Sequence, residues 1–172
     1  MAAIPTINNG DAANDTWPDA VTSALTAYGC VLLRTADQTI SDATDTAVTF
    51  PSGSVTEVLD TSSFHDTGSD TARITIPSGG DGWYDVGACV EFAANSTGHR
   101  QVWIEDSATE VKGSRVTNNG FATVNPRLAT PTLPMLLSAG DYVTVNVRQS
   151  SGGNLAIKAD GIRFWCVRRW PA

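Results

Sequence analysis

The chain carries few side chains that could act together as acids, bases or metal ligands. Its two histidines, His65 and His99, lie in polar segments. His65 stands beside Asp66 and near Asp70, a grouping that could ligate a metal or transfer protons. The sequence has no nucleophile motif, HExxH pattern or second histidine pair to complete such a site. We therefore expect solvated loops around both histidines, no catalytic residue and no metal ligand.

The acidic residues are spread over predicted loops rather than gathered into one ligand set. No Asp-x-Asp-x-Asp run occurs, and although calcium binding by some loop aspartates stays open, we expect no cofactor. A glycosidase needs two carboxylates that face each other across a groove, and the sequence neither excludes such a pair nor selects one. The dispersed aspartates are Asp11, Asp15, Asp37, Asp42, Asp45, Asp60, Asp66, Asp70 and Asp81.

The five tryptophans are more informative than the titratable residues. Trp103 alternates with Val102 and Ile104, and Trp165 alternates with Phe164, so each indole should point to the strand face opposite its neighbours. Exposed aromatic side chains of this kind mark subunit interfaces or sugar-stacking surfaces. We favour the subunit interface over glycan contact.

Charge and hydropathy exclude two classes of partner. The formal net charge is −7, so the summed field of the protein repels phosphate backbones and anionic lipids, and we expect no nucleic acid partner. No window approaches the roughly 18 apolar residues that span a membrane, and the first residues do not follow the pattern of a secretion signal. We expect neither a membrane partner nor secretion.

The three cysteines predict buried free thiols. An odd number cannot pair completely within one chain, and Cys30, Cys89 and Cys166 each lie in an apolar run typical of a strand. A free cysteine behaves as a small core hydrophobe.

Residues 1–29 differ from the rest of the chain and are predicted to form an extended arm followed by a short helix. Thr16-Trp17-Pro18-Asp19 is a helix-start signature, and Gly29 supplies a stop. A helix of about three turns is marginal in water, so its apolar stripe must pack on something larger. We expect docking through Ile4, Ile7, Trp17, Val21, Leu25 and Tyr28.

Short apolar runs separated by turn residues follow from Cys30 onward, which predicts a β-sandwich over residues 30–172. Residues 84–92 and 143–148 alternate clearly, so each run should bury one face. Residues 162–167 are apolar almost throughout, which fits a central strand or one whose outer face meets another subunit; we favour the subunit interface. The predicted strands are Cys30–Arg34, Ala47–Phe50, Val55–Leu59, Ala72–Ile76, Trp83–Phe92, Gln101–Glu105, Glu110–Val116, Leu133–Leu137, Tyr142–Gln149, Leu155–Lys158 and Ile162–Val167.

A series of short motifs between about Ile40 and Val167 resembles the complement globular-head and tumour-necrosis-factor-like (TNF-like) jelly roll. The resemblance implies an all-β sandwich of about ten strands that assembles as a tight homotrimer around aromatic and apolar positions. We expect Trp103, Tyr142, Phe164 and Trp165 at that interface. The motifs are Ile74-x-Ile76-Pro77, Gly82-Trp83-Tyr84-Asp85-Val86, Gly98-x-Arg100-x-Val102-x-Ile104, Leu136-x-Ser138-Ala139-Gly140-Asp141-Tyr142-Val143, Gln149 and Phe164.

The N-terminal segment, with its isoleucines, Pro5, Gly10-Asp11 and a helix led by Trp17, looks like the start of minor tail and fibre proteins of tailed bacteriophages. That resemblance implies a non-enzymatic virion protein that assembles in the bacterial cytoplasm, docks on other virion proteins through its arm and touches host glycan. A capsid decoration protein, either a cement or a head fibre, is the alternative. Other classes left open are a glycan-degrading enzyme and a cellular carbohydrate-binding module.

Overall fold

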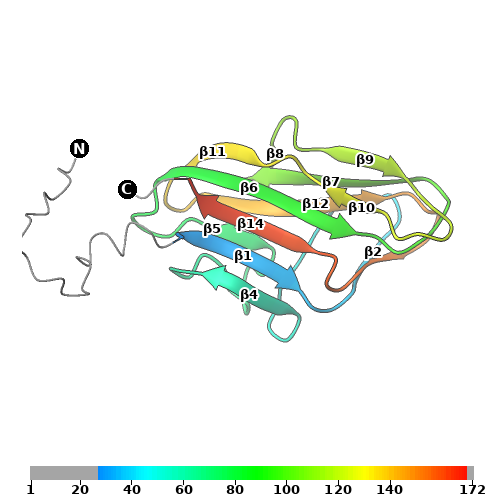
Figure 1. Cartoon of the computed structure of the whole chain (residues 1–172), viewed down its shortest axis with the longest axis horizontal. Coiled ribbons are helices and arrows are strands. Elements are labelled where there is room, and N and C mark those ends of the chain that lie inside the picture. The colour runs from blue at the N-terminus through cyan, green and yellow to red at the C-terminus, as the bar shows by residue number, and fades with distance from the viewer. Residues whose placement is uncertain (1–26, 170–172) are drawn as a thin grey trace, which may run out of the picture.

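The computed structural model describes residues 27–169, and every regular element in this range is a β-strand (Figure 1). The all-β jelly-roll prediction is confirmed, and the predicted helix before Ala27 lies outside the described residues. The strands are β1 (Gly29–Arg34), β2 (Gln38–Ile40), β3 (Thr46–Ala47), β4 (Val55–Asp60), β5 (Arg73–Thr75), β6 (Gly82–Glu91), β7 (His99–Asp106), β8 (Thr109–Glu110), β9 (Val116–Asn119), β10 (Arg127–Ala129), β11 (Leu133–Leu137), β12 (Tyr142–Gln149), β13 (Leu155–Ile157) and β14 (Arg163–Arg168).

Two antiparallel sheets form the sandwich. The first sheet runs β4, β1, β14, β6, and both β10 and β11 pair along the far edge of β6. In the second sheet, β3 and β5 pair with β12, followed by β7, which pairs with β8 and β9. A two-stranded ribbon of β2 and β13 completes the set. The first and last strands are neighbours, because Gly29 lies opposite Val167, so the described chain begins and ends at the same end of the molecule (Figure 1).

The core lies between the two sheets and follows the alternation predicted for their longest strands. Tyr84, Val86, Ala88 and Val90 of β6 are fully buried, as are the alternate valines of β12. The Tyr84 hydroxyl donates a hydrogen bond to the carbonyl of Gly80 at 2.5 Å, so its polar end is satisfied inside the core. Each fully buried aliphatic or aromatic side chain contributes about 1.5–3 kcal/mol relative to exposure.

Two arginines are buried without a carboxylate partner in the described part of the chain. The guanidinium of Arg100 is fully buried and donates to the backbone carbonyls of Asn95, Thr97 and His99 at 2.9–3.0 Å. Arg34 donates to carbonyls of Thr49 and Asp37 in the same manner. Burial lowers the pKa of both guanidinium groups. These side chains hold loop backbone to the ends of their strands, because carbonyl groups withdrawn from water need donors.

Several predicted boundaries were wrong where a turn or a pairing partner decides the conformation. The predicted strand Glu110–Val116 is broken by a turn at Lys112 and Gly113, whose φ is 83°, and the chain continues as the separate strands β8 and β9. Asn118 and Asn119 lie outside the predicted strands, yet they extend β9 because they pair with Arg100 and His99. The short strands β2 and β10 were missed, since neither carries a clear apolar alternation.

Candidate functional site

The first sheet has an apolar outer face, and this face is the main candidate site. An antiparallel sheet that faces water normally alternates apolar side chains inward with polar side chains outward. Here the strand registers instead place apolar or small residues side by side on the outside, which we call the apolar face. It consists of Val31, Leu33, Leu59, Trp83, Gly87, Cys89, Ala129, Pro134, Leu136, Trp165 and Val167.

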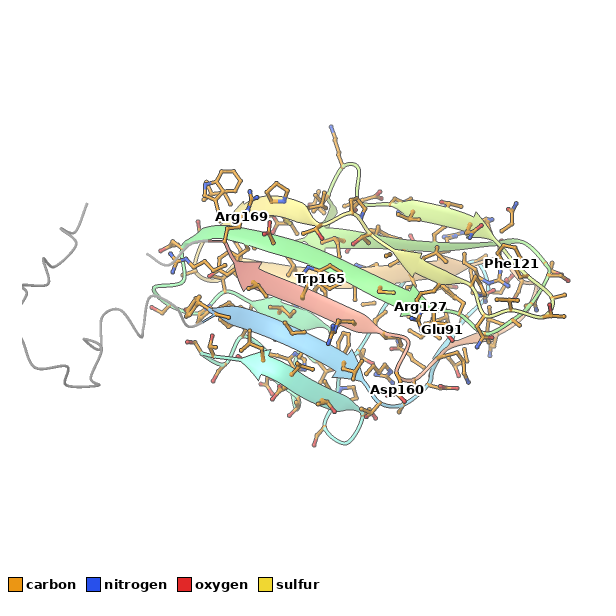
Figure 2. The ribbon with its side chains drawn as sticks, viewed as in Figure 1. Glu91, Phe121, Arg127, Asp160, Trp165 and Arg169 are labelled. Carbon is orange, nitrogen blue, oxygen red and sulfur yellow. The ribbon has the colours of Figure 1, made fainter. Side chains whose placement is uncertain are left out.

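Trp165 occupies the middle of the apolar face (Figure 2). It lies opposite Gly87 on one neighbouring strand and Val31 on the other. The indole rests on Gly87, because a Cβ built on that glycine would overlap ring atom Cζ2 and lie 2.8 Å from Cε2. The glycine therefore gives a wide, flat aromatic surface room to lie along the sheet rather than stand out from it.

Trp83 and Leu136 form the most exposed part of the apolar face. They lie opposite each other on β6 and β11, and their side chains are 50% and 65% exposed. Adjacent large apolar side chains at this exposure are typical of a protein contact surface rather than of solvent-facing sheet.

Two ion pairs stand towards the ends of the apolar face, and Arg163 lies on it opposite Leu33 and Cys89. The middle of the face, around Trp165, Val31 and Gly87, carries no charged side chain. Arg169 pairs with Asp85 at 3.1 Å, and Arg127 pairs with Glu91 at 2.6 Å. Figure 2 shows Arg169 at one end of the sheet and the Glu91–Arg127 pair towards the other. The hydrogen bond from Arg127 lowers the pKa of Glu91, so this pair stays charged at neutral pH. Such an arrangement, with an apolar middle and a polar surround, is that of a protein interface.

All three thiols are free, as predicted. Cys30 and Cys166 lie opposite each other on β1 and β14 and are fully buried, which confirms the prediction for these two, whereas the predicted burial is only partial at Cys89. Cys89 is only half-buried and lies on the apolar face beside Ala129 and Arg163. Burial raises the pKa of all three thiols, so each favours the neutral, poorly nucleophilic form.

The four residues predicted for the trimer interface do not share one surface. Trp165 lies on the apolar face, whereas Phe164 points inward and stacks on Phe50 with ring centroids 6.1 Å apart. Trp103 and Tyr142 lie on the outer side of the other sheet. Other residues lie beside Trp165 on the apolar face, such as Val31 on β1 and Val167 on β14. Val31 and Val167 each alternate with buried residues in their own strand, and this alternation is the sequence signal that could have identified them.

Trp103 is almost fully buried although it faces away from the core. It is 1% exposed, its Nε1 donates to the carboxylate of Glu105 at 2.9 Å, and the guanidinium of Arg115 covers the ring at 3.8 Å. Arg115 is fixed in turn by Glu110. Local side chains therefore shield this tryptophan without a second subunit.

Of the residues predicted to dock on a particle, Ile4, Ile7, Trp17, Val21 and Leu25 lie outside the described residues. Tyr28 is described, and it belongs with the head. Its ring packs edge-on against Phe64 at 5.1 Å, and Arg168 lies 5.5 Å from its centroid. Tyr28 therefore anchors the start of β1 to the core.

Both histidines are part of the folded head, and His65 holds backbone in place. The solvated loop expected at His65 is wrong, because this ring is only 7% exposed and lies 2.9 Å from the carbonyl oxygens of both Arg73 and Phe50. The solvated loop expected at His99 is also wrong, because this residue begins β7, is half-buried and lies 2.9 Å from the hydroxyl of Ser150. Within residues 27–169, no three acidic, histidine or cysteine side chains converge as a metal-ligand set. No helix in this range is long and apolar enough to cross a membrane.

The sheet order and the core define the class of fold as a TNF-like jelly roll. Among solved structures, the chain is similar to murine APRIL at pH 8.5, with a TM-score of 0.55 and 16% identity over 83% of this chain and 99% of that chain. It is also similar to Eiger TNF from S. frugiperda, with a TM-score of 0.53 and 11% identity over 85% and 94% of the two chains. No protein-family model and no curated protein matches the sequence. At these identities, it is the structural similarity that establishes a shared fold.

Proposed function

We propose that this chain is a non-enzymatic structural protein of a tailed-bacteriophage virion, whose jelly-roll head assembles as a homotrimer through the apolar face. The observation that carries the proposal is the apolar face itself. Its centre combines Trp165, Val31 and Gly87 with no ion pair between them, and it covers the middle of a sheet rather than one edge. Self-association would withdraw this surface from water, which is the main favourable term in protein association.

A second copy of the chain is the occupant that fits the apolar face best. The TNF-like fold favours a homotrimer rather than a homodimer, since the family that the sequence resembles assembles as trimers. In a three-fold ring each subunit presents two different patches, so the apolar face of one copy would meet another surface of the next.

The minor tail or fibre role rests on the segment before the head. Residues 1–26 would attach the protein to other virion proteins through Ile4, Ile7, Trp17, Val21 and Leu25. The geometry of the head supports such an arm, because the described chain enters and leaves at one end. The opposite end, which carries the exposed side chain of Phe121, would then project outward (Figure 2). Capsid decoration is the second candidate, as it needs the same arm and head.

Oligomeric mass tests the assembly directly. Light scattering during size-exclusion chromatography should give the mass of three 18.1 kDa chains. Val31→Glu places a charge on the apolar face between Trp165 and Leu59 and should shift the protein towards the monomer, because a buried unpaired carboxylate is costly. Thr117→Glu, on the exposed outer side of the second sheet, is the matched control and should leave the mass unchanged. A monomeric wild-type chain at micromolar concentration would refute the trimer and favour a carbohydrate-binding module.

Particle attachment needs its own experiment. Deleting residues 1–26 keeps Tyr28 and β1 intact, so the head should fold and associate normally yet fail to enter particles. Normal incorporation of the truncated protein would exclude the arm as the attachment element. Release of sugar from host wall polysaccharide, abolished by a single carboxylate substitution, would instead establish a glycan-degrading enzyme.

A further inference from the structure

The outer side of the second sheet is hollowed into an open cavity of about 440 Å³, on the opposite side of the sandwich from the apolar face. The hollow forms where β3 and β5 pair with different parts of β12 and small side chains leave space between them. Its polar and aromatic lining includes Asp70, Arg73, Glu105, Tyr142, Thr144 and Asn146.

Neighbouring strands present a row of hydrogen-bonding groups to this cavity. Thr144 on β12 lies directly between Arg73 on β5 and Glu105 on β7 in the strand register. A guanidinium, a hydroxyl and a carboxylate are thus set side by side on rigid sheet. Asn146 occupies the next outward position along β12, between Ala47 and Trp103.

The two floor residues are buried yet retain unused hydrogen-bonding capacity. Thr144 and Asn146 are each 7% exposed, and the amide nitrogen of Asn146 donates to the hydroxyl of Thr144 at 2.9 Å. Among residues 27–169, the Asn146 carbonyl oxygen accepts no hydrogen bond and the Thr144 hydroxyl has no acceptor. The Asn146 oxygen is open to the cavity, because the fully buried side-chain atoms without a partner in this range are only the Nε atoms of Arg34 and Arg100. An acceptor and a donor at the cavity floor are therefore accessible to a ligand.

The walls of the cavity are already held in place. The guanidinium of Arg73 lies 4.1 Å from the centre of the Tyr142 ring and pairs with Asp70 at 3.1 Å. Glu105 is fixed by the hydrogen bond from Trp103, which leaves its second carboxylate oxygen available. Side chains fixed before binding lose little conformational entropy when a ligand arrives.

The chemistry of the lining selects the ligand class. Two carboxylates stand against one guanidinium, and the whole chain carries a net charge of −7, so an anion is disfavoured. The apolar part of the lining is limited to small alanines and the ring of Tyr142, so a hydrophobic ligand would gain little free energy from burial here. A neutral molecule rich in hydroxyl groups matches the mixed donors and acceptors. The volume lies within the roughly 300–1,000 Å³ of small-molecule sites.

We propose that this cavity is a binding site for a neutral saccharide unit, with Asn146, Thr144, Glu105 and Arg73 as its hydrogen-bonding groups. The site deepens the proposed virion function, because it specifies where the head would contact glycan. It does not require the trimer, since it lies on the other sheet from the apolar face.

Saturation-transfer NMR on the full chain tests the site. The probes are the methyl glycosides of glucose, galactose and mannose, together with N-acetylglucosamine and the anionic sugar glucuronate. At least one neutral sugar should receive saturation. Asn146→Leu fills the floor without hydrogen-bonding groups and should weaken that binding by about tenfold or more, because a sugar hydroxyl loses its partner. Asn118→Leu makes the same change at an exposed position on β9 and should bind like the wild type.

A second variant keeps the test decisive if Asn146→Leu fails to fold. Glu105→Gln preserves the shape of the site and an acceptor for Trp103, and it should weaken binding of the neutral sugar measurably. The proposal is overturned if no neutral sugar receives saturation, if Asn146→Leu and Asn118→Leu bind equally, or if glucuronate binds more tightly than the glucoside. The mass of the same samples reports assembly separately, so loss of the trimer and loss of sugar binding are distinguishable.

Discussion

The indole of Trp165 lies along the sheet against Gly87 of the neighbouring strand, in a space that no side chain at position 87 could share. This relationship gives the apolar face its flat centre. It also makes Gly87 the most sensitive position of the face, because a methyl group there must displace either the indole or the strand.

Gly87→Ala should therefore disturb both stability and assembly. We expect the free energy of unfolding to fall by about 1–3 kcal/mol, the usual cost of overpacking. Denaturant titration measures this change, and light scattering measures the accompanying loss of the trimer. Gly153→Ala is the matched control, since its Cβ would meet nothing within 4 Å. Equal stability of the two variants would show that Trp165 does not depend on the glycine.

Arg100→Lys should destabilise the head although the charge is conserved. A single ammonium group cannot reach the three carbonyls that the guanidinium now satisfies. Because buried acceptors are left without donors, we expect the free energy of unfolding to fall by about 2 kcal/mol or more. Arg148→Lys, whose partner Asp45 is exposed, should change it by less than about 0.5 kcal/mol. Similar small losses in both variants would contradict the role given to Arg100.

The thiols should react in a fixed order. Cys30 and Cys166 are fully buried, so they should be alkylated only after unfolding. Cys89 is half-buried on the apolar face and should react slowly in the assembled protein but faster in Val31→Glu, which exposes the face. Mass spectrometry after timed treatment with iodoacetamide identifies the labelled cysteine. If Cys89 reacts at the same rate in both proteins, the interface does not cover this part of the sheet.

Stability should decline on the alkaline side. Burial raises the pKa of Tyr84 from 10.0 to about 12, and it raises the pKa of Cys30 and Cys166 above their ordinary 9.0. The unfolded chain then loses these protons at lower pH than the folded chain does. The free energy of unfolding should be unaffected by these groups below about pH 9 and fall as the pH rises towards 12.

Tyr84→Phe isolates one part of this effect. The variant loses the hydrogen bond to Gly80, so it should be less stable at neutral pH by about 0.5–1.5 kcal/mol. Its stability should then depend less on pH between 10 and 12 than that of the wild type. Denaturant titrations across this range measure both effects, and parallel curves for the two proteins would contradict the buried state of the Tyr84 hydroxyl.

Local patterns predicted the longest elements well and the site poorly. The limits of β12 agree with the predicted strand, because alternation over five or more residues reports which side of a strand faces the core. The limits of β11 agree as well, although this strand is apolar throughout. The histidine environment was not predictable in this way. His65 is buried because Phe50 and Arg73, which flank it from separate segments, offer carbonyl groups to its ring.

Trp103 and Trp165 separate what the sequence alone predicts from what the tertiary structure decides. Alternation alone determined that both indoles point away from the core and that residues 84–92 bury one face, and the short apolar runs from Cys30 onward indicated strands. Only the pairing of distant strands decided that Trp165 lies beside Gly87 and Val31, while Trp103 lies on the opposite sheet beneath Arg115. The alternation of apolar and polar residues in a strand shows only to which side of its own backbone each side chain points. Which strand becomes its neighbour depends on hydrogen bonds and packing between segments far apart in the chain.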